Sequence, residues 1–475
     1  MEQKTNSNLR LGMTFMASIF FIFGFITNFN IAMKDQVQLA FTLSNFEANL
    51  VNFSFFIAYA VFSFLCGYII KKIGYKNGVI AGLILVSAGS YMFFPAVALL
   101  SYPLFLLAVF VMATGVVFLQ TAANPYVVAL GPQDSAPARL NLTQALNGVG
   151  TTIAPFLAGI LVLAPAVLAM NAAASSGLPA DEAAKQAASF VQMPFVVIGS
   201  IVLVIAAGIA FIKLPDISGN GTIPSKSVFK KPQVWLGAIG IFCYVGAEVG
   251  TASQIAPYLR ESGTPADVAV RLSAIYWGGG MVGRFFGSIL LSTLAASKKY
   301  LYSAFVMVFA FFVGWFLTSA NFVDGQYKFV SQPLNGLIFM VIAIFNFFLM
   351  LLGRGKAHMA LGIFGTVNVL LILSAAMMPA TVGMWCLLSI GFFNSIMFPN
   401  IFSLGVRDLD PSEMPLASGI INTLIVGGAI VPLLMGGLTD IFTARWALLI
   451  PILCYSYITF FALKGSKIRQ TEFKD

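Results

Sequence analysis

The sequence predicts an all-α polytopic membrane protein with two six-helix bundles and an inserted helical hairpin, about fourteen transmembrane helices in total. Three observations lead to this fold class. The 475 residues are 59% hydrophobic and only 9% charged, whereas soluble domains carry about 25% charged residues. Long apolar windows follow one another along almost the whole chain, and two landmarks of the first half recur in the second half.

Each apolar window can cross a bilayer as one helix, which requires about 20 residues. The first window is too long for a signal-peptide core, so we expect it to be a retained span. The windows lie at 11–33, 48–70, 78–98, 103–130, 143–164, 193–213, 234–258, 270–292, 299–319, 335–353, 359–378, 382–405, 415–437 and 444–463. An even number of spans leaves both termini on one side of the membrane.

The basic residues predict which side carries the termini, because cytoplasmic loops are enriched in Lys and Arg. With cytoplasmic termini, 20 of the 26 Lys and Arg residues lie on the cytoplasmic side, Arg284 among them. Those predicted outside are Lys34, Lys185, Arg260, Arg271, Lys328 and Arg445. We therefore expect a multi-pass protein of the inner (plasma) membrane with both termini in the cytoplasm.

An internal repeat divides the chain. NPYVVALG, with Pro125, is echoed by FPNIFSLG, with Pro399, and GTTIAPFLAG is echoed by GGAIVPLLMG at identical spacing. Matched landmarks in the same order indicate a parallel duplication of a bundle. The sequence thus predicts a six-helix bundle at 1–213, a cytoplasmic linker at 214–232 and a second bundle at 233–475, into which a helix pair is inserted at about 296–357.

Several classes of function find no support. The positive charge gathers in no single stripe, which argues against nucleic acid as a partner. The four cysteines have no CxxC spacing and the chain has one histidine, so neither a metal site nor a disulfide framework is expected. Without a phosphate-binding loop GxxxxGK[ST] or an acid–base constellation, neither an ATP-driven pump nor an enzyme is expected.

Glu248 is the acidic residue that falls in the middle of a predicted span, within YVGAEVGTASQ. Ionisable residues at mid-membrane usually line cavities or relay ions. We expect Glu248 to couple a cation, either Na⁺ or a proton. The alternative is a carboxyl group that is held neutral or hydrogen-bonded for packing alone.

Amide side chains form the second candidate group. They lie on two adjacent spans at helical spacing, so those of each span share a face. Amides donate and accept hydrogen bonds at once, which suits the hydroxyl groups of an uncharged sugar. The alternative is hydrogen bonding between helices. The candidates are Gln120, Asn124, Asn141, Gln144 and Asn147, with Asn28, Asn30, Asn394 and Asn422 as weaker ones.

Two aromatic residues leave both interpretations open. Tyr276 and Trp277 lie early in the eighth predicted span. Aromatic rings can stack on a sugar ring, but they also gather at membrane interfaces.

LQTAANPYVVALGP followed by RLNLTQALNGVG resembles the signature of the fucose–galactose–glucose–proton symporter family of the major facilitator superfamily. Its TAANPY core is fairly specific, FTLSNFEANL and SIMFPNIFSLGV are similar to further stretches of the family, and YVGAEV resembles its glucose/galactose and N-acetylglucosamine branch. The resemblance implies two bundles of six helices that work by alternating access around a central sugar site. The family's sugar-site amides fall on Gln144 and Asn147.

The chain departs from the family's fucose–proton members at two positions. Those members have Glu in the LETAANP motif, where this chain has Gln120, and an aspartate in the first span, where this chain has Ile31. Asp35 follows four residues later. Both proton-titrating carboxylates of that model are therefore missing from the first bundle, and Glu248 remains as the mid-membrane acid.

These inferences predict a secondary active transporter, without a cofactor, that imports a monosaccharide such as glucose or galactose by cation symport. Its expected partners are the small-molecule sugar and the lipid bilayer, and we expect a monomer. The alternatives are a facilitator of the same fold, a sugar sensor that does not transport, and a drug exporter.

Overall fold

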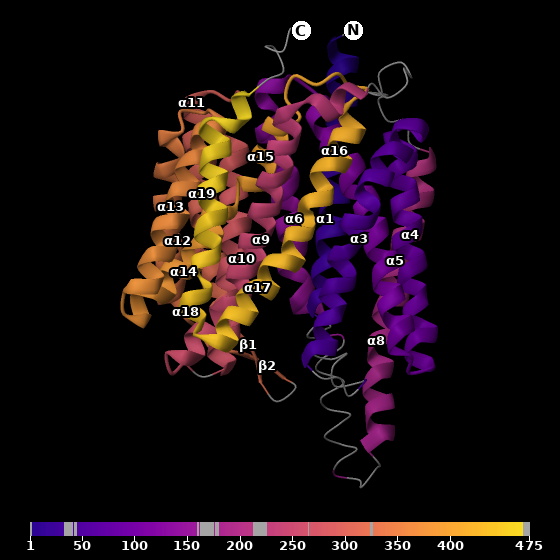
Figure 1. Cartoon of the computed structure of the whole chain (residues 1–475), viewed down its shortest axis with the longest axis vertical. Helices are drawn as coiled ribbons and strands as arrows, with labels where there is room; N and C mark the ends of the chain where they lie inside the picture. The colour runs from indigo at the N-terminus through magenta and orange to yellow at the C-terminus, as the bar shows by residue number, and fades with distance from the viewer. Residues whose placement is uncertain are drawn as a thin grey trace.

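A computed structural model describes residues 2–32, 41, 45–158, 161, 175, 180–211, 226–264, 266–323 and 326–468. The helices of the first bundle stand side by side (Figure 1). They are α1 (Glu2–Ala32), α3 (Asn45–Ile73), α4 (Tyr75–Ala98), α5 (Tyr102–Ala129), the turn η1 (Gln133–Ser135), α6 (Ala136–Ala158) and α8 (Ala180–Phe211). Most of the predicted linker 214–232 and the side chains of Ile31 and Asp35 lie outside the described residues.

The second bundle follows the turn η3 (Lys226–Lys230). Three of its predicted spans are each divided into shorter helices. Its elements are α9 (Pro232–Glu261), α10 (Ala266–Leu290), α11 (Ala296–Ser319), β1 (Ala320–Val323), β2 (Gln326–Phe329), α12 (Pro333–Leu352), α13 (Ala357–Met377), α14 (Ala380–Asn394), α15 (Met397–Gly405), α16 (Met414–Thr423), η4 (Leu424–Val426), α17 (Gly427–Ile441), α18 (Ala444–Ala447), α19 (Leu449–Leu463) and η5 (Gly465–Lys467).

The fold class predicted from the sequence is confirmed. Within the described part of the chain, twelve helical segments are long and apolar enough to cross a membrane. The two predicted spans that fall short are α6 and α10, which pack against each other between the bundles. Their surroundings explain their lower hydropathy, because both line the central cavity described below.

Both bundles repeat one arrangement. In the first, α4 packs against α5 and α8, and in the second α13 packs against α14 and α19. The helices α11 and α12 pack on each other and on α10 at the outside of the second bundle, and β1 and β2 form an antiparallel turn between them (Figure 1). They correspond to the predicted inserted pair. The exact domain boundaries, 1–213, 214–232 and 233–475, stay predictions.

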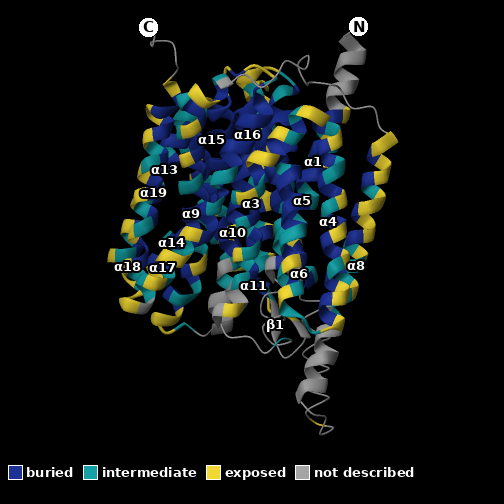
Figure 2. Cartoon of the chain, turned by 45° about the vertical axis from the view of Figure 1, so that its right-hand side comes forward, coloured by how far each residue is buried: buried dark blue, intermediate teal, exposed yellow. Residues whose placement is uncertain are grey.

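The two ends of the molecule differ in packing. We call the end at which α1 begins and α19 ends the terminal face, and the opposite end the distal face (Figure 1). Buried residues gather around α15 and α16 near the terminal face (Figure 2). There a Cβ atom added to Gly67 of α3 would lie 2.5 Å from the carbonyl oxygen of Pro415 in α16. The backbones of the two bundles are therefore in direct contact on this side.

Candidate functional site

A cavity of about 1220 Å³ lies between the two bundles. Its lining residues in α1 (23–28) belong to the end of that helix nearer the distal face, those in α9 (244–260) run from the middle of the helix to its distal end, and those in α3 (52–59) belong to its distal half. Because the terminal side is closed by backbone contact, the cavity opens toward the distal face.

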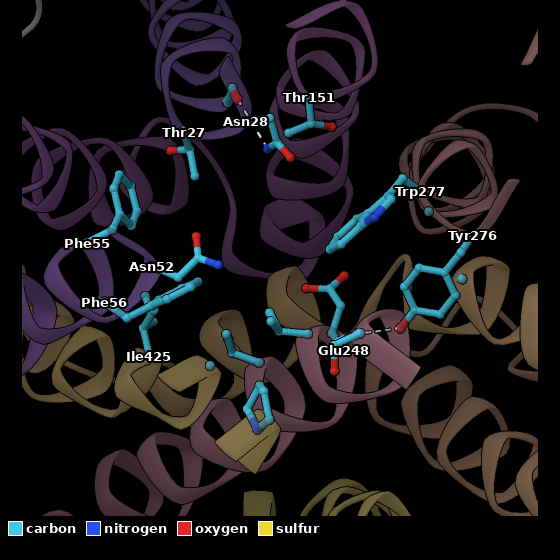
Figure 3. A pocket seen from close by; sticks show the side chains of 18 of the residues that line it. Thr27, Asn28, Asn52, Phe55, Phe56, Thr151, Glu248, Tyr276, Trp277 and Ile425 are labelled. Carbon is cyan, nitrogen blue, oxygen red and sulfur yellow. Dashed lines mark hydrogen bonds between the residues drawn. The ribbon is translucent and has the colours of Figure 1, made fainter. Parts of the chain in front are cut away.

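The first bundle gives the cavity a wall of amides and hydroxyls. Three of the predicted residues, Gln120, Gln144 and Asn147, line it. The Nδ2 atom of Asn147 donates a hydrogen bond of 3.1 Å to the carbonyl oxygen of Phe20, which fixes the amide against α1. The sequence analysis did not single out Asn52 and Thr27, which point toward the same space (Figure 3).

Glu248 projects into the cavity from the second bundle, opposite this wall (Figure 3). Its Oε1 atom accepts a hydrogen bond of 2.6 Å from the hydroxyl of Tyr244, one turn earlier in α9. The same atom lies 3.8 Å from Nη2 of Arg284 in α10. The side chains of Glu248 and Arg284 are only 13% and 11% exposed. A mid-membrane carboxylate thus has one hydrogen-bond donor and one cation beside it.

The position of Arg284 corrects the count of basic residues at the cytoplasmic ends of helices. The side chain is buried at the cavity and does not lie in a solvated loop. Its Nη1 atom donates to the carbonyl oxygen of Gln144 at 3.4 Å, and its Nε atom to that of Ser395 at 3.3 Å. Arg284 therefore connects the second bundle to α6 of the first.

The sequence after Ser395 explains why its carbonyl oxygen is available to accept a hydrogen bond from Arg284. Ser395 lies at the break between α14 and α15. In a continuous helix its oxygen would accept from the residue four positions later, but that residue is Pro399, which has no N–H group. The proline of the repeated FPNIFSLG landmark thus supplies an acceptor for the buried guanidinium group.

A network of buried polar side chains is hydrogen-bonded to the backbone of Glu248. The hydroxyl of Tyr276 donates to the backbone oxygen of Glu248 at 2.9 Å (Figure 3). The same hydroxyl accepts from Nδ2 of Asn394 at 2.6 Å. The Oδ1 atom of Asn394 accepts from the hydroxyl of Tyr455 and from Nδ2 of Asn368. Side chains from four helices of the second bundle, α10, α13, α14 and α19, thus form a hydrogen-bonded network that ends on the α9 backbone at Glu248.

Trp277 lies on the cavity wall, with its ring between Glu248 and Thr151 in the view of Figure 3. Its ring and that of Tyr276 meet edge to face, with centroids 5.4 Å apart. The inserted helix α11 contributes Phe316 and Leu317 to the same cavity. An aromatic surface is thus available beside the polar groups.

Two predicted binding residues do not line the cavity. Asn124 is fully buried, and neither atom of its amide has a hydrogen-bond partner in the described part of the chain. Asn141 is also fully buried and donates to Oδ1 of Asn400 across the bundle interface at 3.2 Å. Both lie nearer the terminal face than Gln120 and Gln144, so we leave them out of the site that opens distally.

The weaker amide candidates also divide into one that lines the cavity and others that do not. Asn28 lines the cavity, Asn394 belongs to the network behind Glu248, and Asn422 donates to Thr121 across the bundles. Asn30 is buried outside the cavity lining, and its amide has no partner among the described residues.

The balance of charge indicates the kind of ligand that fits. The charged residues among the described lining are Glu248, Arg260 and Arg284. Glu248 and Arg284 pair with each other, and apart from Arg260 the other polar groups of the described lining are amides and hydroxyls, beside aromatic rings. Such a surface suits an uncharged ligand with many hydroxyl groups. The described residues hold no group of three His, Cys, Asp or Glu side chains that could bind a metal ion.

The family model of the Major Facilitator Superfamily matches residues 15–368. The chain belongs to this superfamily. The resemblance of the chain to the fucose–galactose–glucose–proton symporters is also confirmed, because the chain matches relatives of that family over nearly its full length. It is 35% identical to a glucose/galactose transporter of Brucella abortus biovar 1 (strain 9-941), over 98% of this chain and 97% of that protein.

A second relative of this superfamily member is the L-fucose-proton symporter of Escherichia coli (strain K12). It is 30% identical, over 94% of this chain and 91% of that protein. Among solved structures, a Major Facilitator Superfamily transporter, FucP, in the outward conformation is similar, with a TM-score of 0.73 and 28% identity. That match covers 96% of this chain and 98% of the other.

Proposed function

We propose that this protein imports a monosaccharide, a hexose such as glucose or galactose, by proton symport and alternating access. One observation carries the proposal: the cavity places the amide wall of the first bundle opposite the Glu248–Arg284 pair of the second. A sugar bound between them would touch both bundles, which lets its binding bias their relative arrangement. The activities for which the relatives are named, glucose/galactose transport and L-fucose-proton symport, agree with this substrate class.

Gln120, Gln144 and Asn147 would bind the sugar hydroxyls, together with Asn52. An amide group combines donors and an acceptor, as hydroxyl groups require. Trp277 would stack on the apolar face of the sugar ring. A lining of amides and aromatic rings favours a neutral sugar over a cationic drug, because the acidic group of the described lining already has a cationic partner.

Glu248 would couple the cation, and the presence of Arg284 favours a proton over Na⁺. A guanidinium group 3.8 Å from the carboxylate oxygen repels a second cation at the same place. A proton, in contrast, neutralises the carboxylate and removes the attraction between the two side chains. Arg284 would then keep its contacts with Gln144 and Ser395, so that a change at Glu248 reaches the bundle interface.

In the cell we expect a monomer in the inner membrane, with the terminal face in the cytoplasm and the cavity open to the outside. No cofactor takes part in this mechanism and no bond is made or broken in the sugar.

Uptake into proteoliposomes tests the proposal. Labelled glucose, galactose, fucose, mannose and N-acetylglucosamine are each supplied with an imposed proton gradient, with an imposed Na⁺ gradient, and with neither. Accumulation above equilibrium under the proton gradient is the expected result. Equilibration without accumulation would instead establish the facilitator, in which Glu248 has a structural role. Failure of all five sugars to move would refute the substrate class.

A further inference from the structure

A second set of polar side chains is buried between the bundles, between the cavity and the terminal face. The first bundle contributes one member from each of α3, α5 and α6, and the second contributes members from α15 and α16. All six side chains are fully buried. They are Ser63, Asn124, Asn141, Asn400, Ser418 and Asn422.

Most of these side chains have unused hydrogen-bonding capacity. Both amide atoms of Asn124 and the hydroxyls of Ser63 and Ser418 have no partner among the described residues, and neither does Oδ1 of Asn141 or Asn422. A buried polar atom without a partner destabilises the arrangement that contains it. Apolar residues at these positions would stabilise the distally open arrangement better than polar ones. The polar residues therefore indicate a second arrangement of the bundles, in which these side chains contact water.

The geometry places these groups along one path. Asn422 of α16 donates to Thr121 of α5 at 3.3 Å, and these two helices run in opposite directions. Asn124 lies one turn after Thr121, and Ser418 one turn before Asn422, so both are one turn nearer the terminal face. A Cβ atom added to Gly419 would lie 2.7 Å from the carbonyl oxygen of Ser63. The backbones of the two bundles are therefore in direct contact at this set of side chains.

The chemistry of the set matches that of the open cavity. It contains amides and hydroxyls and no charged side chain. Across the bundles, charge lies further out, in the exposed pair Asp134–Arg407, whose Oδ1 and Nη2 atoms are 3.4 Å apart. An uncharged, polyhydroxylated solute and its water are the ligands that such a lining would take.

We propose that these six residues line the path by which the sugar leaves toward the terminal face once the bundles separate there. The inference rests on the proposed function, because it needs a solute that crosses between the bundles. It differs from a permanent packing role, in which the six side chains would stay buried throughout the transport cycle.

Accessibility of single cysteines tests the path. In a background with Cys66, Cys243, Cys386 and Cys454 replaced by alanine, Ser63→Cys and Ser418→Cys each place a thiol in the set. Ser90→Cys is the matched control, because Ser90 is equally buried but bonds within its own helix α4, inside the first bundle. A charged, membrane-impermeant methanethiosulfonate reagent is added to inverted and to right-side-out vesicles during transport of galactose.

We expect both interface thiols to react about tenfold faster than the control thiol, and only from the side of the terminal face. This rate corresponds to an arrangement open at the terminal face that is populated by about a few per cent of molecules or more. Rates equal to that of Ser90→Cys from both sides would overturn the inference. Two substituted helices are used so that one misfolded variant does not decide the result.

Uptake by the cysteine-free background, measured in the same vesicles, separates the two proposals. Uptake with no excess labelling refutes the path and leaves the function intact. Labelling without uptake of any sugar refutes the substrate class, while the opening between the bundles stands. As a second measurement, Asn124→Ala is expected to raise the half-saturating galactose concentration about threefold on the terminal side only, corresponding to one lost hydrogen bond. An unchanged value on that side would exclude contact between Asn124 and the sugar.

Discussion

At the scale of single residues, Glu248 and Arg284 depend on each other. Both are nearly buried, and each would be an uncompensated charge if the other were removed. Breaking such a pair at one partner costs about 3–5 kcal/mol, because the remaining charge stays in a poorly solvated place. Protonation of Glu248 likewise leaves the Arg284 guanidinium without its counter-charge, so the gain or loss of one proton changes the stability of this arrangement, which makes the pair suitable for coupling to a proton.

Glu248→Gln tests this role. Glutamine keeps the size of the side chain and an acceptor for Tyr244 but cannot exchange a proton. We expect gradient-driven accumulation to be lost, while exchange of labelled for unlabelled sugar at equal concentrations continues. Both are measured in proteoliposomes.

Glu261→Gln is the matched control, since Glu261 ends the same helix α9 and bonds the backbone of Ala444 outside the cavity lining. It should accumulate sugar like the unmodified protein. Accumulation by Glu248→Gln at the same level would exclude Glu248 from coupling.

The amides that line the cavity are expected to contribute to the affinity for the sugar. Asn147→Ala removes an amide from the cavity lining, together with the hydrogen bond to Phe20. We expect the KM for the sugar to rise about tenfold, as for the loss of about 1.4 kcal/mol of binding free energy. Initial rates of uptake measure this change.

Asn346→Ala is the control for loss of a buried amide elsewhere. Asn346 lies in α12 and donates to Phe392 away from the cavity lining. A similar rise of KM in both variants would attribute the effect to packing and would contradict a binding role for Asn147.

The sequence was informative about Glu248 and less so about Arg284, for a physical reason. An acid in the middle of an apolar run is visible from composition alone, because the cost of burying it holds in any fold. Arg284 lies six residues before the end of α10, where an exposed basic residue is common. Its role depends on the break at Ser395 and on the approach of α6, which are tertiary features.

At the scale of elements, the crossing of α3 and α16 closes the terminal side. A side chain at Gly67 meets the carbonyl oxygen of Pro415 at 2.5 Å, a distance that the backbone of α16 can relieve only by moving. Glycine at this position is needed for close approach and not for an unusual backbone angle.

Gly67→Ala is therefore expected to weaken the closure and to shift the protein away from the distally open arrangement. Faster reaction of Ser418→Cys with the impermeant reagent, together with slower net uptake, is the predicted result. Gly208→Ala in α8 is the control, because among the described residues no atom beyond the adjoining backbone of α8 lies within 4 Å of its added Cβ. An unchanged labelling rate in Gly67→Ala would show that this crossing does not hold the terminal side closed.

The spans themselves could be predicted from the sequence, but their interruptions could not. Apolar length identifies 382–405 as one span, yet the helix breaks between Asn394 and Met397. The sequence identifies Pro399 as part of an internal repeat. Which carbonyl it frees, and which side chain then binds that carbonyl, depends on the neighbouring helix α10.

At the scale of the whole molecule, the two bundles enclose one polar volume that continues into a closed polar interface. Asn124 and Asn141 were predicted to bind sugar because they share helix faces with Gln120 and Gln144. Helical spacing places residues on a common face, but the level along the helix at which the bundles meet is not encoded in local spacing. In this arrangement of the bundles that level divides the predicted set into open and closed parts.

The central claim is that this polar volume carries a sugar together with a proton. Uptake of labelled galactose or glucose by the unmodified protein, with and without an imposed proton gradient, tests it most directly. The account predicts accumulation above equilibrium under the proton gradient and collapse of that accumulation when a protonophore is added. Uptake that reaches only equilibrium in every condition would contradict it.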